Sequence, residues 1–97
     1  MVTGLLLKDV KTGQERTLPV VGVFFYIGVD PINEPVSGLL NLTQEGFIKA
    51  GEDTQTAIPG VFAVGDIRKK TNRQIASAVA DGCNAAYAVE EYLLAKE

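Results

Sequence analysis

The segment from about Gln74 to Ala95 predicts a long helix with very little polar surface. Most of its positions are Ala, Val, Ile, Leu, Tyr or Cys. Four of its polar residues are spaced four, three and seven positions apart, which places them on one narrow stripe: Ser77, Asp81, Asn84 and Glu91. A helix this apolar needs cover over most of its circumference, which one small domain can hardly supply alone. A large uncovered apolar patch usually marks an interface.

Composition places the chain among small globular proteins. It has 97 residues, of which 46% are hydrophobic, and a formal net charge of −3. This is enough apolar material for one small domain, and it excludes an intrinsically disordered chain. The mild acidity argues against nucleic acid as a partner, because nucleic-acid-binding domains are usually basic. No apolar run approaches the ~20 residues of a membrane span, so we expect no membrane as a partner either.

The cysteine and histidine content narrows the possible chemistry. Cys83 is the only cysteine, and there is no histidine. A zinc site of the usual N/S type is therefore not expected, and Ser-His-Asp and Cys-His relays are excluded. We expect the lone thiol to pack inertly in the interior. The chain cannot form an internal disulfide, and its start, MVTGLLLKDV, has no secretory signal. Both features are typical of a cytoplasmic protein.

The first part of the chain predicts β-structure. Residues 3–10 and 15–20 read as a β-hairpin that turns at Gly13. The continuous apolar run GVFFYIG, residues 22–28, predicts a strand that is buried on both faces. The two prolines of VDPINEPVSG then indicate a loop, which is a candidate crossing between domains.

Short β-pieces and turns are predicted between this loop and the helix. LNLTQEGFIKAG reads as two short edge pieces around a turn at Glu45-Gly46. Pro59 and Gly60 stand where a type II turn requires them. VFAV, residues 61–64, reads as a fully apolar strand. The charged stretch after it, Arg68 to Lys70, is expected to be a solvated loop rather than a phosphate or nucleic-acid patch.

The strand, Gly65-Asp66 and the helix together predict a ligand site. Open α/β sheets bind ligands beyond the carboxyl ends of their strands, which is where Gly65 and Asp66 would lie. A glycine permits close approach, and a carboxylate accepts hydrogen bonds from hydroxyl groups while it repels phosphate. The first turn of the following helix offers free N–H groups to a carbonyl or a developing anion. A flavin, with a polyol chain and a polar ring, has both complements. On the residues alone, a solvated Asp that ends the strand is an equally good interpretation.

TAIPGVFAVGDI resembles the second flavin-binding motif of the pyridine nucleotide-disulfide oxidoreductases, T-x-x-P-x-[VI]-[FY]-A-x-G-D. The whole chain is most similar to the C-terminal end of low-molecular-weight bacterial thioredoxin reductases. GVFFYIGVDPINE resembles their crossing segment, and RQIASAVADGCNAAYAVEEYL resembles their last helix. The resemblance implies an α/β fold, here a partial Rossmann-like FAD/NAD(P)-binding domain with a β-hairpin or meander and a long C-terminal helix.

The resemblance also implies which residues contact FAD. Gly65 and Asp66 would lie at the ribityl chain, with the Asp66 carboxylate accepting a hydrogen bond from it. Arg73, Gln74 and Ile75 would lie at the flavin ring, with the Ile75 N–H facing a pyrimidine carbonyl. The family most often has Ala where this chain has Ile75, a change that a backbone contact tolerates. No metal site and no catalytic residue of the chain's own is implied.

Other family features are missing from the sequence. Neither of the two G-x-G-x-x-G nucleotide motifs occurs, and the redox C-x-x-C pair is absent. The chain therefore resembles the last third of such an enzyme. Residues 1–27 would be the tail of the NADPH-binding domain, and residues 28–97 the C-terminal lobe of the FAD-binding domain.

The leading hypothesis is thus the C-terminal FAD-binding portion of a thioredoxin-reductase-like, NAD(P)H-dependent flavin disulfide oxidoreductase. We expect little turnover and weak or absent FAD binding from this chain alone. NAD(P)H and a thioredoxin-like partner would belong to the intact enzyme, which forms a homodimer in this family. Two alternatives stay open: a portion of a ferredoxin-NAD(P) reductase of similar fold, and a non-catalytic domain that self-associates.

Overall fold

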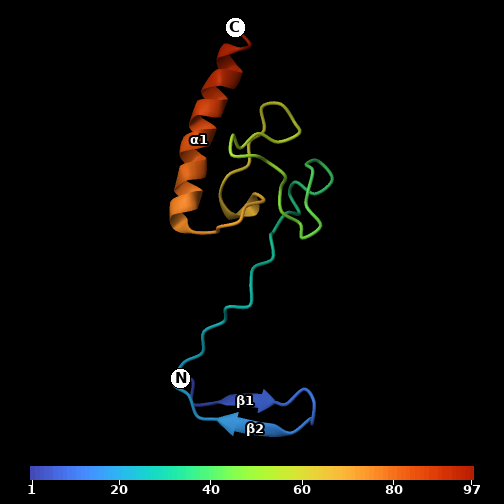
Figure 1. Cartoon of the computed structure of the whole chain (residues 1–97), viewed down its shortest axis with the longest axis vertical. Coiled ribbons are helices and arrows are strands. Elements are labelled where there is room, and N and C mark those ends of the chain that lie inside the picture. Colours follow the sequence, from blue (N-terminus) through green and yellow to red (C-terminus); the bar gives the residue numbers. More distant parts are fainter.

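The computed structural model describes residues 1–97 and sets a β-hairpin apart from the rest of the chain (Figure 1). Strands β1 (Leu5–Lys8) and β2 (Glu15–Leu18) pair antiparallel, with Leu5 opposite Leu18. The Asp9 carboxylate closes the turn, because it accepts hydrogen bonds of 2.8 Å from the backbone N–H groups two and three residues later. The predicted hairpin is confirmed.

The apolar run at residues 22–28 is not the buried strand that its sequence predicts. It is an extended segment without a β-ladder, and it connects the hairpin to the C-terminal part (Figure 1). Its large side chains are exposed, with Phe24 at 83% and Tyr26 at 90%. The physical reason is that a strand needs a neighbour for its backbone hydrogen bonds, and no other segment of this chain lies beside it.

Loops and single β-bridges make up residues 29–64. The predicted loop at 29–38 is confirmed, since it contains no helix or strand and turns from residue 34 on. The two edge pieces meet in one antiparallel bridge, Leu42 with Ile48, and Ile48 also forms a parallel bridge with Arg68. The expected strand at 61–64 is reduced to one bridge, Phe62 with Gln55. Only single bridges form, because no strand of greater length lies beside these segments to pair with them.

The predicted turn at Pro59-Gly60 is present. The Val61 N–H donates to the Ile58 carbonyl at 3.0 Å, and Gly60 has a φ of +82°. A positive φ at the third residue of a four-residue turn is the signature of type II. A side chain at Gly60 would also collide with Tyr92, since a Cβ there would lie 2.8 Å from its hydroxyl. The turn therefore brings the 56–62 loop against the end of the helix.

Helix α1 (Ile75–Leu94) begins after Gln74, as predicted, and follows a short 3-10 turn, η1 (Gly65–Ile67). It runs alongside the looped part of the chain (Figure 1). Its buried positions are Asp81 and Ala88, so of the polar stripe only Asp81 is buried, while Asn84 and Glu91 are exposed. Much of its apolar surface is exposed instead of covered: Ile75, Val79, Tyr87, Leu93 and Leu94. No helix of the structure combines the length and the apolar character that crossing a membrane requires.

The core is small and lies between the loops. Leu40, Ile48 and Ala63 form it, and four half-buried residues pack around them: Val36, Leu42, Ala50 and Ile67. Only 7 of the 97 residues are buried, which is too few for the apolar content of the chain. The structure is therefore a small α/β piece, with a hairpin and one long helix, that leaves most of its apolar side chains uncovered.

Candidate functional site

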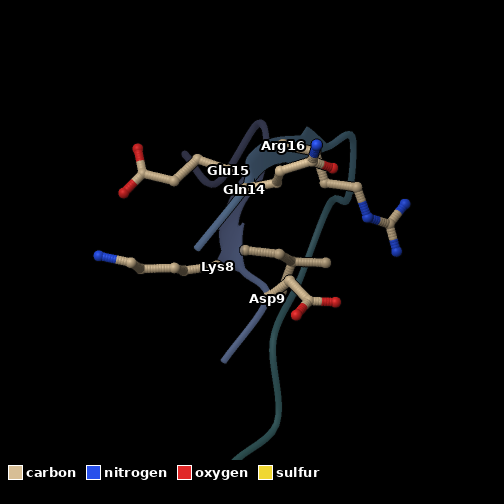
Figure 2. A pocket seen from close by; sticks show the side chains of 6 residues that line it. Lys8, Asp9, Gln14, Glu15 and Arg16 are labelled. Carbon is tan, nitrogen blue, oxygen red and sulfur yellow. The ribbon is translucent and has the colours of Figure 1, made fainter. Parts of the chain in front are cut away.

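A hollow over the β-hairpin contains none of the residues that the sequence singles out. Its side chains spread away from one another, with Lys8 and Glu15 extending to one side and Arg16 to the other (Figure 2). One of its six lining residues is hydrophobic. Diverging, solvated charges on a two-stranded hairpin do not hold a ligand from several sides. This hollow is therefore not the candidate site.

The structure brings the predicted site residues together at the start of α1. Asp66, from η1, lines a hollow of about 280 Å³ with Arg73, Gln74 and Ile75, and Ala78 completes the wall. Gly65 lies directly before Asp66 and closest to the same alanine, since a Cβ at Gly65 would be 3.9 Å from the Ala78 Cβ. Up to ten positions of sequence separate these site residues, and the turn between η1 and α1 brings them into contact with one hollow.

Asp66 offers a free acceptor to this hollow. Its side chain is exposed and forms no hydrogen bond or ion pair within the chain. The residue before it, Gly65, has a φ of +76°, which L side chains adopt only with strain. The left-handed glycine thus turns the backbone so that Asp66 faces the helix start. A carboxylate without a protein partner is suited to accept hydrogen bonds from ligand hydroxyl groups.

The first turn of α1 offers donors to the same hollow. The Ser77 hydroxyl oxygen accepts a hydrogen bond of 3.1 Å from the Gln74 backbone N–H, which satisfies the donor at the cap position. The N–H of Ile75 belongs to the first turn, so it has no acceptor within the helix. Together with the positive end of the helix dipole, it favours an electron-rich carbonyl or an anion.

Arg73 joins the two sides of the hollow. Its Nε donates to the backbone carbonyl of Asp66 at 3.1 Å, and its guanidinium carbon lies 3.7 Å from the centre of the Phe47 ring. A planar cation stacked on an aromatic face is held in orientation as well as in position. Arg73 therefore ties the loop at Phe47 to the Asp66 turn, a contact that the sequence did not predict.

The sequence also did not predict a buried cluster of charged residues, which Arg68, Lys70 and Asp81 form next to the hollow. Arg68 and Asp81 are each 2% exposed, so the expectation of a solvated loop at 68–70 is wrong for Arg68. Asp81 Oδ1 accepts from Arg68 Nη2 at 2.7 Å, and Oδ2 from Nε at 3.1 Å. Lys70 Nζ lies 2.6 Å from Oδ2, with a side chain only 5% exposed. The sequence does contain one signal for this cluster. Of the two acidic residues in the polar stripe, Asp81 is the one that lies in the middle of the helix.

The cluster has matched charges. Hydrogen bonds from Arg68 hold the pKa of the Asp81 carboxyl far below its usual range, against the opposing effect of burial, and Lys70 and the Gly65 N–H act in the same direction. The Asp81 partner in turn raises the pKa of the Arg68 guanidinium. Glu52 adds a longer contact to Arg68 at 3.4 Å from a side chain that is 85% exposed. Both buried ions are thus charged and paired near neutral pH.

Cys83 differs from its expected role. It was expected to be buried, and it is exposed on α1. The apolar surface of the helix is uncovered in this chain, so the thiol has no core to pack into. No group of three or more acidic, cysteine or histidine residues is arranged to hold a metal ion.

Known proteins of one family are similar to this chain. The family model of the pyridine nucleotide-disulphide oxidoreductases matches residues 3–82. A thioredoxin reductase of Streptomyces clavuligerus is 45% identical over 95 residues, which is 97% of this chain and 30% of that protein. The bifunctional thioredoxin reductase/thioredoxin of Mycobacterium leprae is 42% identical over 93 residues, which is 95% of this chain and 20% of that protein.

Solved structures give the same result. The crystal structure of thioredoxin reductase from Streptococcus pyogenes matches with a TM-score of 0.79 and 41% identity, over 96% of this chain and 30% of that one. This chain thus spans about 30% of the length of the thioredoxin reductases that it resembles. Because the family model covers the β-hairpin, the Gly65-Asp66 turn and the first part of α1, the chain belongs to the pyridine nucleotide-disulphide oxidoreductase family.

Proposed function

We propose that this chain is the C-terminal FAD-binding portion of a thioredoxin-reductase-like, NAD(P)H-dependent flavin disulfide oxidoreductase. The observation that carries the proposal is the shared hollow, in which Asp66 and the first turn of α1 lie on two sides of one space. In this arrangement Asp66 accepts a hydrogen bond from the ribityl chain. The Ile75 N–H binds a pyrimidine carbonyl of the flavin ring, while Gly65, Arg73 and Gln74 shape the wall.

The residues present fit a flavin better than a free phosphate. The Asp66 carboxylate is unpaired and would repel a phosphate, whereas the hydroxyl groups of a ribityl chain are neutral donors. The free N–H groups of the helix start suit the carbonyl-rich edge of the ring. When bound, FAD supplies the redox chemistry, and this chain contributes binding and orientation. Since no C-x-x-C pair occurs, the chain adds no redox residue of its own.

The division of the chain follows from the same proposal. Residues 1–27 would belong to the NADPH-binding domain and residues 28–97 to the FAD-binding domain. The crossing would be GVFFYIGVDPINE, residues 22–34, which spans the boundary. NAD(P)H and a thioredoxin-like protein would be bound by a longer cytoplasmic protein rather than by this chain. The M. leprae relative, named as a fusion of reductase and thioredoxin, supports the thioredoxin-like partner.

An NMR titration of the ¹⁵N-labelled chain with FAD tests the proposal and detects weak binding. We expect saturable shifts of the Gly65, Asp66 and Ile75 amides. Asp66→Ala should weaken binding by about 1–3 kcal/mol, as for a hydrogen bond to a charged group. Glu90→Ala is the matched control, because it removes an exposed carboxylate of α1 outside the hollow. FAD binding that shifts other amides and leaves those of Gly65, Asp66 and Ile75 unchanged, or an equal loss of affinity in both variants, would refute the proposal.

The exposed apolar surface supports a second proposal, that copies of the chain self-associate. Phe24, Phe25, Tyr26 and Ile27 are each at least 78% exposed, and they follow one another in sequence. Soluble monomers rarely expose contiguous apolar patches of this kind. Self-association would cover part of this surface without requiring any catalytic activity.

A further inference from the structure

The Gly65-Asp66 turn is held from behind by one helix residue. The Gly65 backbone N–H donates to Asp81 Oδ2 at 2.8 Å, across sixteen positions of sequence. This fixes the peptide group directly before the left-handed glycine, whose φ of +76° then sets the course of the chain into Asp66. Arg73 Nε donates to the carbonyl of Asp66, two peptide groups further along the chain. The backbone of the turn is therefore anchored on both sides of the Asp66 side chain.

Asp81 itself has little freedom to move. Arg68 donates hydrogen bonds to both carboxylate oxygens of Asp81, and Lys70 Nζ contacts Oδ2. Arg68 is in turn fixed by its backbone, since the Arg68 N–H donates to the Gly65 carbonyl at 3.2 Å and the flanking residues pair with Ile48. Charge-assisted, bidentate bonds of this kind combine strength with a defined direction. A buried carboxylate in such a frame is a rigid acceptor for the Gly65 amide.

We infer that Asp81, oriented by Arg68 and Lys70, is a positioning residue for the flavin site. It does not touch the ligand. It holds the Gly65 amide, and through the glycine it directs the Asp66 carboxylate toward the start of α1. This inference rests on the proposed function, because the flavin is the ligand whose ribityl chain Asp66 would bind.

Removal of a single partner would leave an unpaired buried charge and destabilise the fold. The test therefore uses a charge-free variant, Arg68→Met/Lys70→Met/Asp81→Leu, in which apolar side chains of similar size replace the buried ions. Replacements of this type are often neutral or stabilising. The matched control is Glu52→Gln, which changes the exposed contact to Arg68 and leaves the Asp81 bonds in place.

Two measurements are made on the full chain: amide hydrogen exchange at Gly65 and FAD affinity by NMR titration. In the charge-free variant we expect faster exchange at Gly65, with the amides in the middle of α1 still protected. We also expect roughly tenfold weaker FAD binding, the size of one lost bond to a charged acceptor. In Glu52→Gln neither quantity should change. Asp66→Ala combined with the charge-free variant should weaken binding by less than the product of the two separate effects, because Asp81 acts through Asp66.

The outcomes separate this inference from the proposed function. Unchanged Gly65 exchange in the charge-free variant overturns the inference whatever the FAD result. Faster exchange with unchanged FAD affinity also overturns it, since the turn would then not depend on Asp81 for binding. If the wild-type chain binds FAD and Asp66→Ala does not weaken that binding, the proposed function fails, and the flavin role of Asp81 fails with it. Binding by the wild type that Asp66→Ala weakens, while the charge-free variant does not, refutes the inference alone.

Discussion

At the scale of the residue, the conformation of Gly65 is the feature with the most direct consequence. Its φ of +76° costs an L residue about 1–2 kcal/mol, and a Cβ there would meet only ordinary contact with Ala78. We expect Gly65→Ala to lower the free energy of unfolding by about this amount through backbone strain alone. Gly82→Ala is the matched control, because Gly82 lies in α1 with open space around it.

The two glycine substitutions should have opposite signs. In the helix, alanine is favoured over glycine by about 1 kcal/mol, so Gly82→Ala should raise the free energy of unfolding. Urea unfolding followed by helical circular dichroism measures both changes. Equal effects of the two substitutions would show that Gly65 is not held in the left-handed conformation.

A second prediction at this scale concerns acid. Hydrogen bonds from Arg68 place the pKa of Asp81 below the ~3.9 of an unfolded aspartate. The stabilisation from this carboxylate is therefore complete above about pH 4 and is lost as the pH falls from there toward the lower folded pKa. The free energy of unfolding of the wild type should fall more steeply below about pH 4 than that of the charge-free variant.

The comparison of variants removes the effect of other acidic groups. The pKa values of Asp9 and Glu45 are also lowered, by hydrogen bonds within their own loops, and both groups are present in both proteins. Urea titrations at a series of pH values give the two curves. Parallel curves would show that the Asp81 ion pair contributes nothing to acid sensitivity.

At the scale of the element, sequence patterns succeeded where an element is stabilised by its own hydrogen bonds. Helix α1 satisfies its backbone internally, and the hairpin pairs with itself, so both were predictable from local residues. Residues 22–28 and 61–64 have the composition of strands, but a strand needs a neighbouring strand to pair with. In this chain residues 22–28 have no such neighbour, and residues 61–64 form only one bridge.

The candidate site was predictable to a similar degree. Asp66 and the start of α1 could be predicted to lie together, because Asp66 follows an apolar, strand-like run and the helix begins a few residues after it. The burial of Arg68 and Asp81 could not, since it depends on a contact across thirteen positions between a charged loop and a helix face. Composition alone makes both side chains look solvent-exposed.

Amide exchange tests the interpretation of residues 22–28. None of these residues takes part in a backbone hydrogen bond, whereas the β1–β2 pairs and α1 form regular networks. We therefore expect exchange of the Phe24–Ile27 amides at nearly the rate of an unfolded peptide, with slow exchange in the middle of α1. Protection of Phe24–Ile27 equal to that of the helix in dilute samples would contradict the extended, unpaired segment.

At the scale of the whole molecule, shape and burial both indicate an incomplete packing unit. The radius of gyration is 20.2 Å and the longest dimension is 67 Å. A compact domain of this length would have a radius of gyration of about 13 Å. The hairpin accordingly stands apart from α1 and its loops (Figure 1). The apolar segment between them is where additional protein surface would remove the most exposed hydrophobic area.

Self-association is the prediction that follows at this scale. We expect sedimentation of the 10.4 kDa chain to show species larger than the monomer as concentration rises, because association buries the segment around Phe24 and Phe25. Phe24→Ser/Phe25→Ser should shift the equilibrium toward monomer. Val10→Ser is the control, since Val10 is 97% exposed but isolated at the hairpin turn. A monomer at every concentration, or an equal shift by the control, would count against an interface at this segment. Because the apolar run has a free backbone edge as well as exposed rings, pairing of two copies would also slow its amide exchange, which links the two measurements.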